Sequence, residues 1–156
     1  PMGWSINQAT GLTYHKPGQS TKGYTLLTPH GDQSTYLIDM QGRVVHRWHF
    51  THIHPGYGRL LDNGNLLMTG SDVNLPSPPK DEPTKAPLPF EQHITRLGGY
   101  QTTLVEMNWD GEIVWEYENR QQHHDFFRFD NGNTLVPEWV ELPEDLHKQV
   151  RGGYRK

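Results

Sequence analysis

Short runs in which apolar and polar residues alternate recur along this chain, a pattern typical of half-buried β-strands. The runs are rich in Val, Ile, Tyr, Trp and Thr, and tight-turn residues separate them. The pattern therefore predicts an all-β fold. Its strands are expected at residues 24–28, 35–40, 43–50, 57–61, 65–69, 101–109, 112–118, 125–129 and 134–139.

Two segments of the chain resemble each other. The first reads GRVVHRW from Gly42 and then LLDNGNLL, and the second reads GEIVWEY from Gly111 and then RFDNGNTL. The offset between the first motifs is 69 residues, and the offset between the Asn-Gly motifs is 68 residues. A shared offset indicates a repeated supersecondary unit. At this offset, His54 of the first unit matches His123 of the second.

Tight turns define hairpins in both units. Asn63-Gly64 and Asn131-Gly132 lie between apolar runs, which predicts type I′ turns with positive φ at both central residues. A second pair of turns is expected at Gly42 and Gly111.

The repeat favours a β-propeller built of four-stranded antiparallel blades. One blade would contain the strands at 57–61, 65–69, 101–109 and 112–118, with earlier strands in a preceding blade and strands from Asp125 in a following one. Residues 1–156 would then form a single propeller segment of about two blades, whereas closed propellers have at least about four. We expect the remaining blades to come from a longer chain or from other subunits.

Two stretches fall outside the repeat. Residues 71–99 form a proline-rich insertion loop, because proline removes ladder donors. This loop is expected to be a mobile surface segment, with a lid or binding rim as the alternative. The tail at 142–156 is expected to hold a short helix that ends before Gly152-Gly153.

Composition excludes several classes of function. The net charge of −4 argues against nucleic-acid and anionic-membrane partners, and the absence of cysteine excludes disulfides and thiolate chemistry. The chain has no apolar run of membrane-spanning length and no signal-peptide pattern. Pro1 before Met2 resembles a remnant of tag cleavage, so a cytoplasmic location is expected.

The run HHDFFRFDNGNTLV from His123, together with NWDGEIVWEY from Asn108, resembles the repeated motif of the arylsulfotransferase family. The segment from Leu142 to Gly153 is also similar to that family. The resemblance implies a six-bladed propeller with an active site in its central funnel. It also implies sulfuryl transfer between small phenolic compounds through a sulfohistidine, without a nucleotide donor or a cofactor.

Sulfuryl transfer requires a nucleophile, an acid–base group and positive charge. Histidine suits the first two roles, so the candidate catalytic residues are His123, His124 and His54. Neighbouring histidines on an extended segment point to opposite faces, which would let only one of His123 and His124 face the funnel. The candidate substrate-binding residues are Arg59, Arg128 and Asp125, the last of which would fix a histidine tautomer.

Other interpretations stay open. His49 and His52 are interpreted as solvated loop residues, and the ten histidines match no specific metal-ligand spacing, so no metal site is assigned. The same scaffold could instead carry a metal-dependent lyase or hydrolase, or a non-catalytic interaction module. The tryptophans are expected to pack between blades; they are Trp48, Trp109, Trp115 and Trp139.

Overall fold

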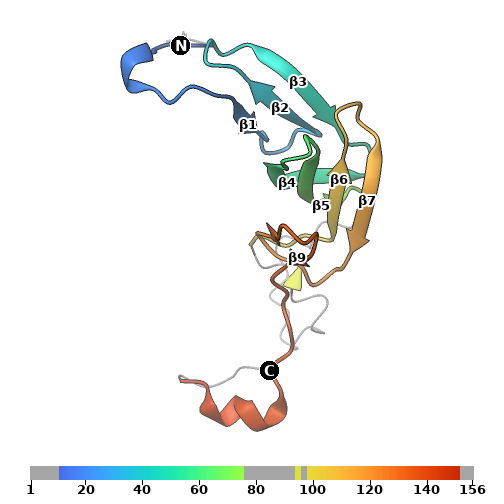
Figure 1. Cartoon of the computed structure of the whole chain (residues 1–156). Coiled ribbons are helices and arrows are strands. Elements are labelled where there is room, and N and C mark those ends of the chain that lie inside the picture. The colour runs from blue at the N-terminus through green and yellow to red at the C-terminus, as the bar shows by residue number, and fades with distance from the viewer. Residues whose placement is uncertain (1–10, 76–93, 96–97, 152–156) are drawn as a thin grey trace, which may run out of the picture.

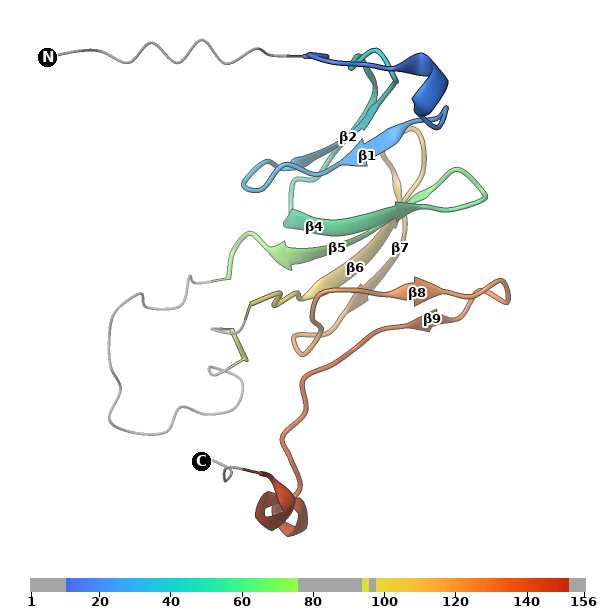
Figure 2. The same ribbon diagram turned by 90° about the vertical axis from the view of Figure 1, so that its left-hand side faces the viewer.

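Three antiparallel sheets follow one another along the chain in the computed structural model, which describes residues 11–75, 94–95 and 98–151 (Figures 1 and 2). The first sheet contains β1 (Thr25–Leu27), β2 (Ser34–Ile38) and β3 (Val44–His49). The second contains β4 (Ile53–Leu60), β5 (Leu66–Asp72), β6 (Thr103–Met107) and β7 (Ile113–Glu118). The third contains β8 (Phe127–Arg128) and β9 (Thr134–Leu135). Two short 3-10 helices, η1 (Pro17–Gln19) and η2 (Glu144–Gln149), lie outside the sheets.

The all-β class and the strand order are confirmed. The four strands expected to pair do so in the order β4-β5-β6-β7, each antiparallel to its neighbour. The described residues do not close into a barrel or a propeller ring. The short helix expected in the tail is η2, whereas Gly152-Gly153 and the insertion prolines Pro76, Pro78, Pro79, Pro83, Pro87 and Pro89 lie outside the described residues.

The strand bounds differ from expectation by more than two residues at β4, β5 and β9. β4 begins at Ile53 rather than residue 57, because the chain continues through a register shift between Pro55 and Gly58. β5 extends to Asp72, so the interruption of the sheet begins after the expected insertion boundary at residue 71. β9 ends at Leu135, two residues before Pro137, because proline cannot supply a ladder donor.

The main hydrophobic core lies between the first and second sheets. Leu37 and Trp48 of the first sheet pack with Ile53, Met68 and Val105 of the second. Alternation along the strands turns Leu67 and Leu104 to the opposite side, where they pack against Phe126 before β8. The middle strands of the second sheet, β5 and β6, are thus buried on both faces, by the first sheet on one side and by the segment before β8 on the other.

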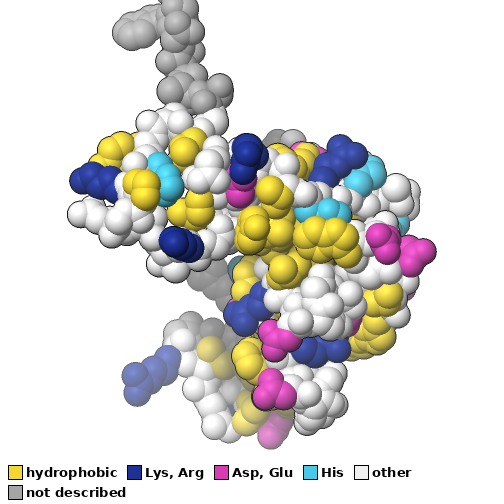
Figure 3. Space-filling view, turned by 45° about the horizontal axis from the view of Figure 1, so that its top comes forward, with side chains coloured by type: hydrophobic (Ala, Val, Ile, Leu, Met, Phe, Trp, Pro, Cys, Tyr) yellow, Lys and Arg dark blue, Asp and Glu magenta, His cyan; other side chains and the backbone are white. Residues whose placement is uncertain are grey.

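Many large hydrophobic side chains nevertheless remain exposed. They gather in the middle of the face shown in Figure 3, among Lys, Arg, Asp, Glu and His side chains. The exposed members on β7 and in the β8–β9 hairpin are Ile113, Val114, Trp115, Tyr117, Phe127, Phe129 and Leu135.

The hairpin turns are not of type I′. In the β4–β5 turn, the N–H of Gly64 donates to the C=O of Leu61 at 2.9 Å. Gly64 has φ of 85°, whereas His124 is the one non-glycine residue with positive φ among the described residues. Asp62 and Asn63 therefore occupy the centre of a type I turn, and Gly64 supplies the left-handed residue of the bulge that follows. The β8–β9 turn ending at Gly132 has the same bonds.

Side-chain oxygens from Asn or Asp stabilise these turns. The side chain of Asn63 accepts a hydrogen bond from the N–H of Asn65 at 3.0 Å, and Asn131 accepts from the N–H of Asn133 at 3.0 Å. In the β2–β3 turn, Asp39 accepts from the N–H groups of Gln41 and Arg43 at 2.9 Å each. The hydrogen bond from the Arg43 N–H lowers the pKa of Asp39, which the other Arg43 and Gln41 contacts reinforce.

The Gly132→Ala substitution is expected to lower the free energy of unfolding by about 1–2 kcal/mol, the cost of a left-handed conformation for an L-residue. Gly132 has φ of 85° and no neighbouring atom within 4 Å of an added Cβ, so strain and not a clash would cause the loss. Urea denaturation measures the change. Gly18→Ala is the matched control, since Gly18 also has open space but no positive φ; equal losses in both variants would contradict the turn assignment.

Candidate functional site

Most of the predicted site residues belong either to β4 or to the segment that leads into β8. The ring of Tyr57 on β4 lies 5.5 Å from the ring of Phe126, and the guanidinium of Arg59 lies 6.0 Å from the ring of Phe127. His123 and Asp125 belong to that same segment. We call Tyr57, Arg59, Asp125, Phe126 and Phe127 the Arg59 cluster.

Arg59 is exposed and donates from Nε to the hydroxyl of Tyr57 at 2.7 Å. This hydrogen bond raises the pKa of the guanidinium, and the negative charge of Asp125 raises it further. Arg59 forms no salt bridge within the described residues. Its terminal nitrogens are therefore available to an anion, which a guanidinium binds through two parallel hydrogen bonds.

Arg128 has a different environment. Its guanidinium lies 3.1 Å from Glu106 Oε2, donates to the C=O of Gly132 at 3.2 Å, and lies 5.2 Å from the ring of Trp115. Its side chain is 22% exposed. These contacts join β8 to β6 and β7, so the structure gives Arg128 a role in packing; substrate binding by Arg128 stays a prediction.

The expectation that His123 and His124 point to opposite faces is wrong. The two rings converge, with their Nδ1 atoms 3.1 Å apart. His124 has φ of 59°, which turns the chain out of the extended conformation that the expectation assumed. At this separation the two Nδ1 atoms can share one hydrogen bond, and the tautomers of the rings decide which Nδ1 donates.

Neighbouring residues hold the histidine pair in place. His123 packs against Trp139, with ring centroids 4.5 Å apart. The N–H of His124 donates to the C=O of Gly99 at 2.8 Å, and the His124 ring occupies the space that a side chain at Gly99 would need. Gly99 itself has φ of 77°. The pair therefore depends on a glycine that no other residue type can replace without strain.

The Gly99→Ala substitution is expected to displace the His124 ring and to lower the free energy of unfolding by about 1–2 kcal/mol through its positive φ. NMR chemical shifts of both imidazoles, together with urea denaturation, measure the two effects. Gly98→Ala is the control, because Gly98 has open space and an ordinary φ. Unchanged imidazole shifts in Gly99→Ala would show that the ring does not lie over Gly99.

Asp125 does not fix a histidine tautomer in this structure. Its Oδ1 accepts a hydrogen bond from the N–H of Phe126 at 2.7 Å. Within the described part of the chain, neither imidazole of the pair bonds to Asp125. The negative charge of Asp125 is the smallest of the effects that raise the pKa of Arg59.

His54 is not the structural counterpart of His123. His54 pairs with Ser71. Ser71 follows the turn glycine Gly64 by the same number of residues as Trp139 follows the turn glycine Gly132, so Trp139 is the counterpart of Ser71 in the second unit. The N–H of Trp139 donates to the C=O of Gln121, so Gln121 occupies the position of His54. The second unit has an additional residue in the bulge between Gln121 and Phe127, and a shorter connection before Gln121. The equal sequence offset of the two histidines therefore does not place them at equivalent positions of the two units.

His54 nevertheless lies at the same end of the second sheet as His123. Its pairing partner Ser71 donates from Oγ to the C=O of Tyr100 at 3.1 Å, and Tyr100 pairs with His123. Burial raises the pKa of the Tyr100 hydroxyl. The side chain of His54 is exposed and makes no hydrogen bond to the described residues. Its imidazole is thus free to contact a ligand.

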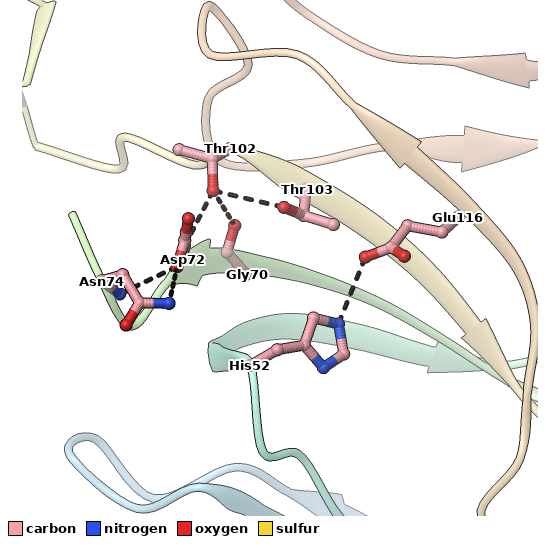
Figure 4. Close-up of polar contacts among 7 residues, drawn as sticks. All are labelled: His52, Gly70, Asp72, Asn74, Thr102, Thr103 and Glu116. Atoms are coloured by element: carbon pink, nitrogen blue, oxygen red, sulfur yellow. Dashed lines mark hydrogen bonds and ion pairs between the residues drawn. The ribbon is translucent and has the colours of Figure 1, made fainter.

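A cavity of about 190 Å³ lies on the opposite face of the second sheet. Buried Ile53, Thr102 and Thr103 line it, together with Asp72 and Glu118. His52 closes one side, where its Nε2 lies 3.2 Å from Glu116 Oε1 (Figure 4). His52 therefore has a specific partner and is not simply a solvated loop residue. The sequence carried no signal for this pair, because Glu116 lies on a distant strand.

Three further findings bear on the class of function. Among residues 11–75, 94–95 and 98–151, no group of three or more His, Asp or Glu side chains is arranged to hold a metal ion. No helix in the same residues has the length and apolar character needed to cross a membrane. No protein-family model matches the sequence, and neither curated proteins nor solved structures show a significant match to it.

Proposed function

We propose that this chain is a segment of a β-propeller that binds aryl sulfates and contributes to sulfuryl transfer between phenolic compounds. The observation that carries the proposal is the exposed Arg59 guanidinium, which has no carboxylate within salt-bridge distance among the described residues and is flanked by Tyr57 and Phe127. A guanidinium beside aromatic rings suits a ligand that joins a planar ring to an anionic group. The motif resemblance of the run from His123 points to the same chemistry.

The proposed transfer proceeds in two displacements. A neutral imidazole nitrogen attacks the sulfur of the aryl sulfate, the S–O bond to the aryl group breaks, and the phenolate leaves and takes up a proton. An acceptor phenol then loses its proton and attacks the sulfur, and the N–S bond breaks. Arg59 would neutralise the sulfuryl oxygens, while His123 and His124, or His54, would supply the nucleophilic nitrogen and the proton.

The propeller part of the proposal rests on the way each sheet packs against the sheet that precedes it in the chain. β3 and β7 hold the same position in successive sheets, and each following sheet packs on the face of the sheet before it. Continued addition of such sheets leads to a ring, which would bring inner strands such as β4 around a central funnel. The remaining blades are expected from a longer chain or from other subunits.

The test uses 4-nitrophenyl sulfate as donor and phenol as acceptor. We expect saturable binding of the donor in saturation-transfer NMR, and at least tenfold weaker binding in Arg59→Ala. Arg43→Ala is the control, since Arg43 is an exposed arginine held by Asp39 in a distant turn. Release of 4-nitrophenolate reports the transfer step, and a variant with alanine at both His123 and His124 tests its dependence on the pair. Equal binding by Arg59→Ala and the unsubstituted chain would refute the proposal.

The alternative functions receive different support. The metal-dependent lyase or hydrolase gains none from the described residues, since they offer no group of three ligands. The interaction module gains support from the exposed aromatic residues of β7, because a platform for a partner needs an uncovered apolar face.

A further inference from the structure

Equivalent aromatic positions of the first and second sheets differ in how they are covered. In the first sheet, His46 and Trp48 of β3 pair with Leu37 and Thr35. In the second, the corresponding residues of β7 are Trp115 and Tyr117, which pair with Glu106 and Leu104. The β2–β3 and β6–β7 pairings carry a register shift at the same point, so each residue of β3 has one counterpart on β7.

The pair in the first sheet is sealed by a turn of the next sheet. Trp48 is 0% exposed and donates from Nε1 to the C=O of Asn108 at 3.0 Å. The ring of Trp109 stacks on His46 at 3.9 Å and meets Trp48 edge-on at 5.4 Å. Asn108 and Trp109 belong to the turn between β6 and β7, which are the third and fourth strands of the second sheet. An aromatic turn of one sheet thus covers the outer strand of the sheet before it.

The corresponding pair in the second sheet lacks this cover. Trp115 and Tyr117 are each 39% exposed. Within the described residues, the third sheet and the segment after it contact this pair through Arg128, 5.2 Å from the Trp115 ring, and Glu138, 3.4 Å from the Tyr117 hydroxyl. In the described residues, this sheet consists of β8 and β9, so it has no third and fourth strands to supply a turn.

Among the residues that the structure describes, no strand pairs with the outer edge of β9 and the residues after it, and this edge is suited to accept one. The C=O of Pro137 and the N–H of Trp139 point inward, to His123 and Gln121. Alternation along an extended chain therefore places the N–H and C=O groups of Val136 and Glu138 on the outer edge. The missing N–H of Pro137 does not interrupt this edge, because it would have pointed inward.

We propose that a β-hairpin of a partner polypeptide adds to this edge as the third and fourth strands of the third sheet. Its turn would carry an Asn or Asp, an aromatic residue and a glycine, as in Asn108–Gly111, and would cover Trp115 and Tyr117. The inference rests on the propeller part of the proposed function and is independent of sulfuryl transfer. Edge-strand addition supplies the backbone hydrogen bonds, and the covered aromatic pair supplies apolar contact.

The probe is a labelled synthetic peptide with the sequence of residues 101–119, which contains the β6–β7 hairpin. We expect saturable binding to the chain in fluorescence anisotropy, with amide hydrogen exchange at Val136 and Glu138 slowed at least tenfold. A peptide carrying Trp109→Ala should bind at least tenfold more weakly. In the chain, Tyr117→Lys should weaken binding, whereas Val45→Lys, a change at an exposed apolar residue of the first sheet, should not.

Several results would overturn the inference. They are the absence of saturable binding, equal binding of a scrambled peptide, and slowed exchange on β5 rather than at Val136 and Glu138, which would indicate displacement of β6. Self-association of the chain through the same face, seen by analytical ultracentrifugation and abolished by Tyr117→Lys, would make a second copy the occupant instead. If the chain binds the hairpin peptide but not 4-nitrophenyl sulfate, only the proposed chemistry is refuted. If it binds 4-nitrophenyl sulfate but not the hairpin peptide, only the hairpin site is refuted.

Discussion

The Glu106→Ala substitution is expected to lower the free energy of unfolding by about 3 kcal/mol. This value is the lower end of the losses observed when one member of a buried ion pair is removed. The Glu106 side chain is 10% exposed and connects three elements. Its Oε1 accepts from Asn65 Nδ2 at 2.8 Å and from Asn63 Nδ2 at 3.3 Å, while its Oε2 lies 3.1 Å from Arg128. Alanine would leave the Arg128 guanidinium without its carboxylate.

Urea denaturation measures this loss, and Glu112→Ala is the control. The carboxylate of Glu112 also accepts a hydrogen bond from an asparagine, Asn108, at 2.8 Å, but it lies on an exposed turn. We expect its removal to change stability by no more than about 0.5 kcal/mol. Similar losses in the two variants would contradict the role of Glu106 in joining β8 to the second sheet.

The Trp48→Ala substitution is expected to cost about 3–5 kcal/mol, since it removes a fully buried aromatic side chain and leaves a cavity. Trp48 lies at the boundary of the first two sheets, where it contacts Trp109 and the C=O of Asn108. Loss of this side chain should therefore reduce the cooperativity between the two sheets as well as the total stability. Thermal unfolding followed by near-UV and far-UV circular dichroism measures both.

Tyr117→Ala serves as the control for Trp48→Ala, because Tyr117 occupies the same position in the second sheet but is 39% exposed. A smaller loss is expected, because less apolar surface returns to water. A loss at Tyr117 equal to that at Trp48 would show that burial at the boundary does not distinguish the two positions.

Much of the fold could be predicted from the sequence because its determinants are local. The glycines at 42, 64, 111 and 132 follow short polar turn segments, and apolar alternation on either side defines the hairpins. These features gave the strand positions and the four-stranded sheet. The expected type I′ turn is wrong, because Asp62 and Asn63 occupy the centre of the turn and Gly64 follows it.

The candidate site was harder to predict because it depends on backbone irregularities. The positive φ of His124 brings together two rings that strand alternation would separate. His54 and His123 occupy different positions, because the second unit has both a shorter connection before Gln121 and one additional bulge residue before Phe127. Contacts between distant strands, such as that of His52 with Glu116, leave no local pattern in the sequence. The tryptophan at 48 was correctly expected to pack between sheets, since large aromatic residues favour such positions.

The stacking of successive sheets can be measured directly by NMR. The indole Nε1–H of Trp48 donates to the C=O of Asn108, so it should show strong nuclear Overhauser effects to protons of the β6–β7 turn, including those of Trp109. This indole proton should also exchange slowly with solvent. A rapidly exchanging Trp48 indole without Overhauser effects to residues 107–110 would contradict the stacking from which the propeller and the proposed hairpin site are argued.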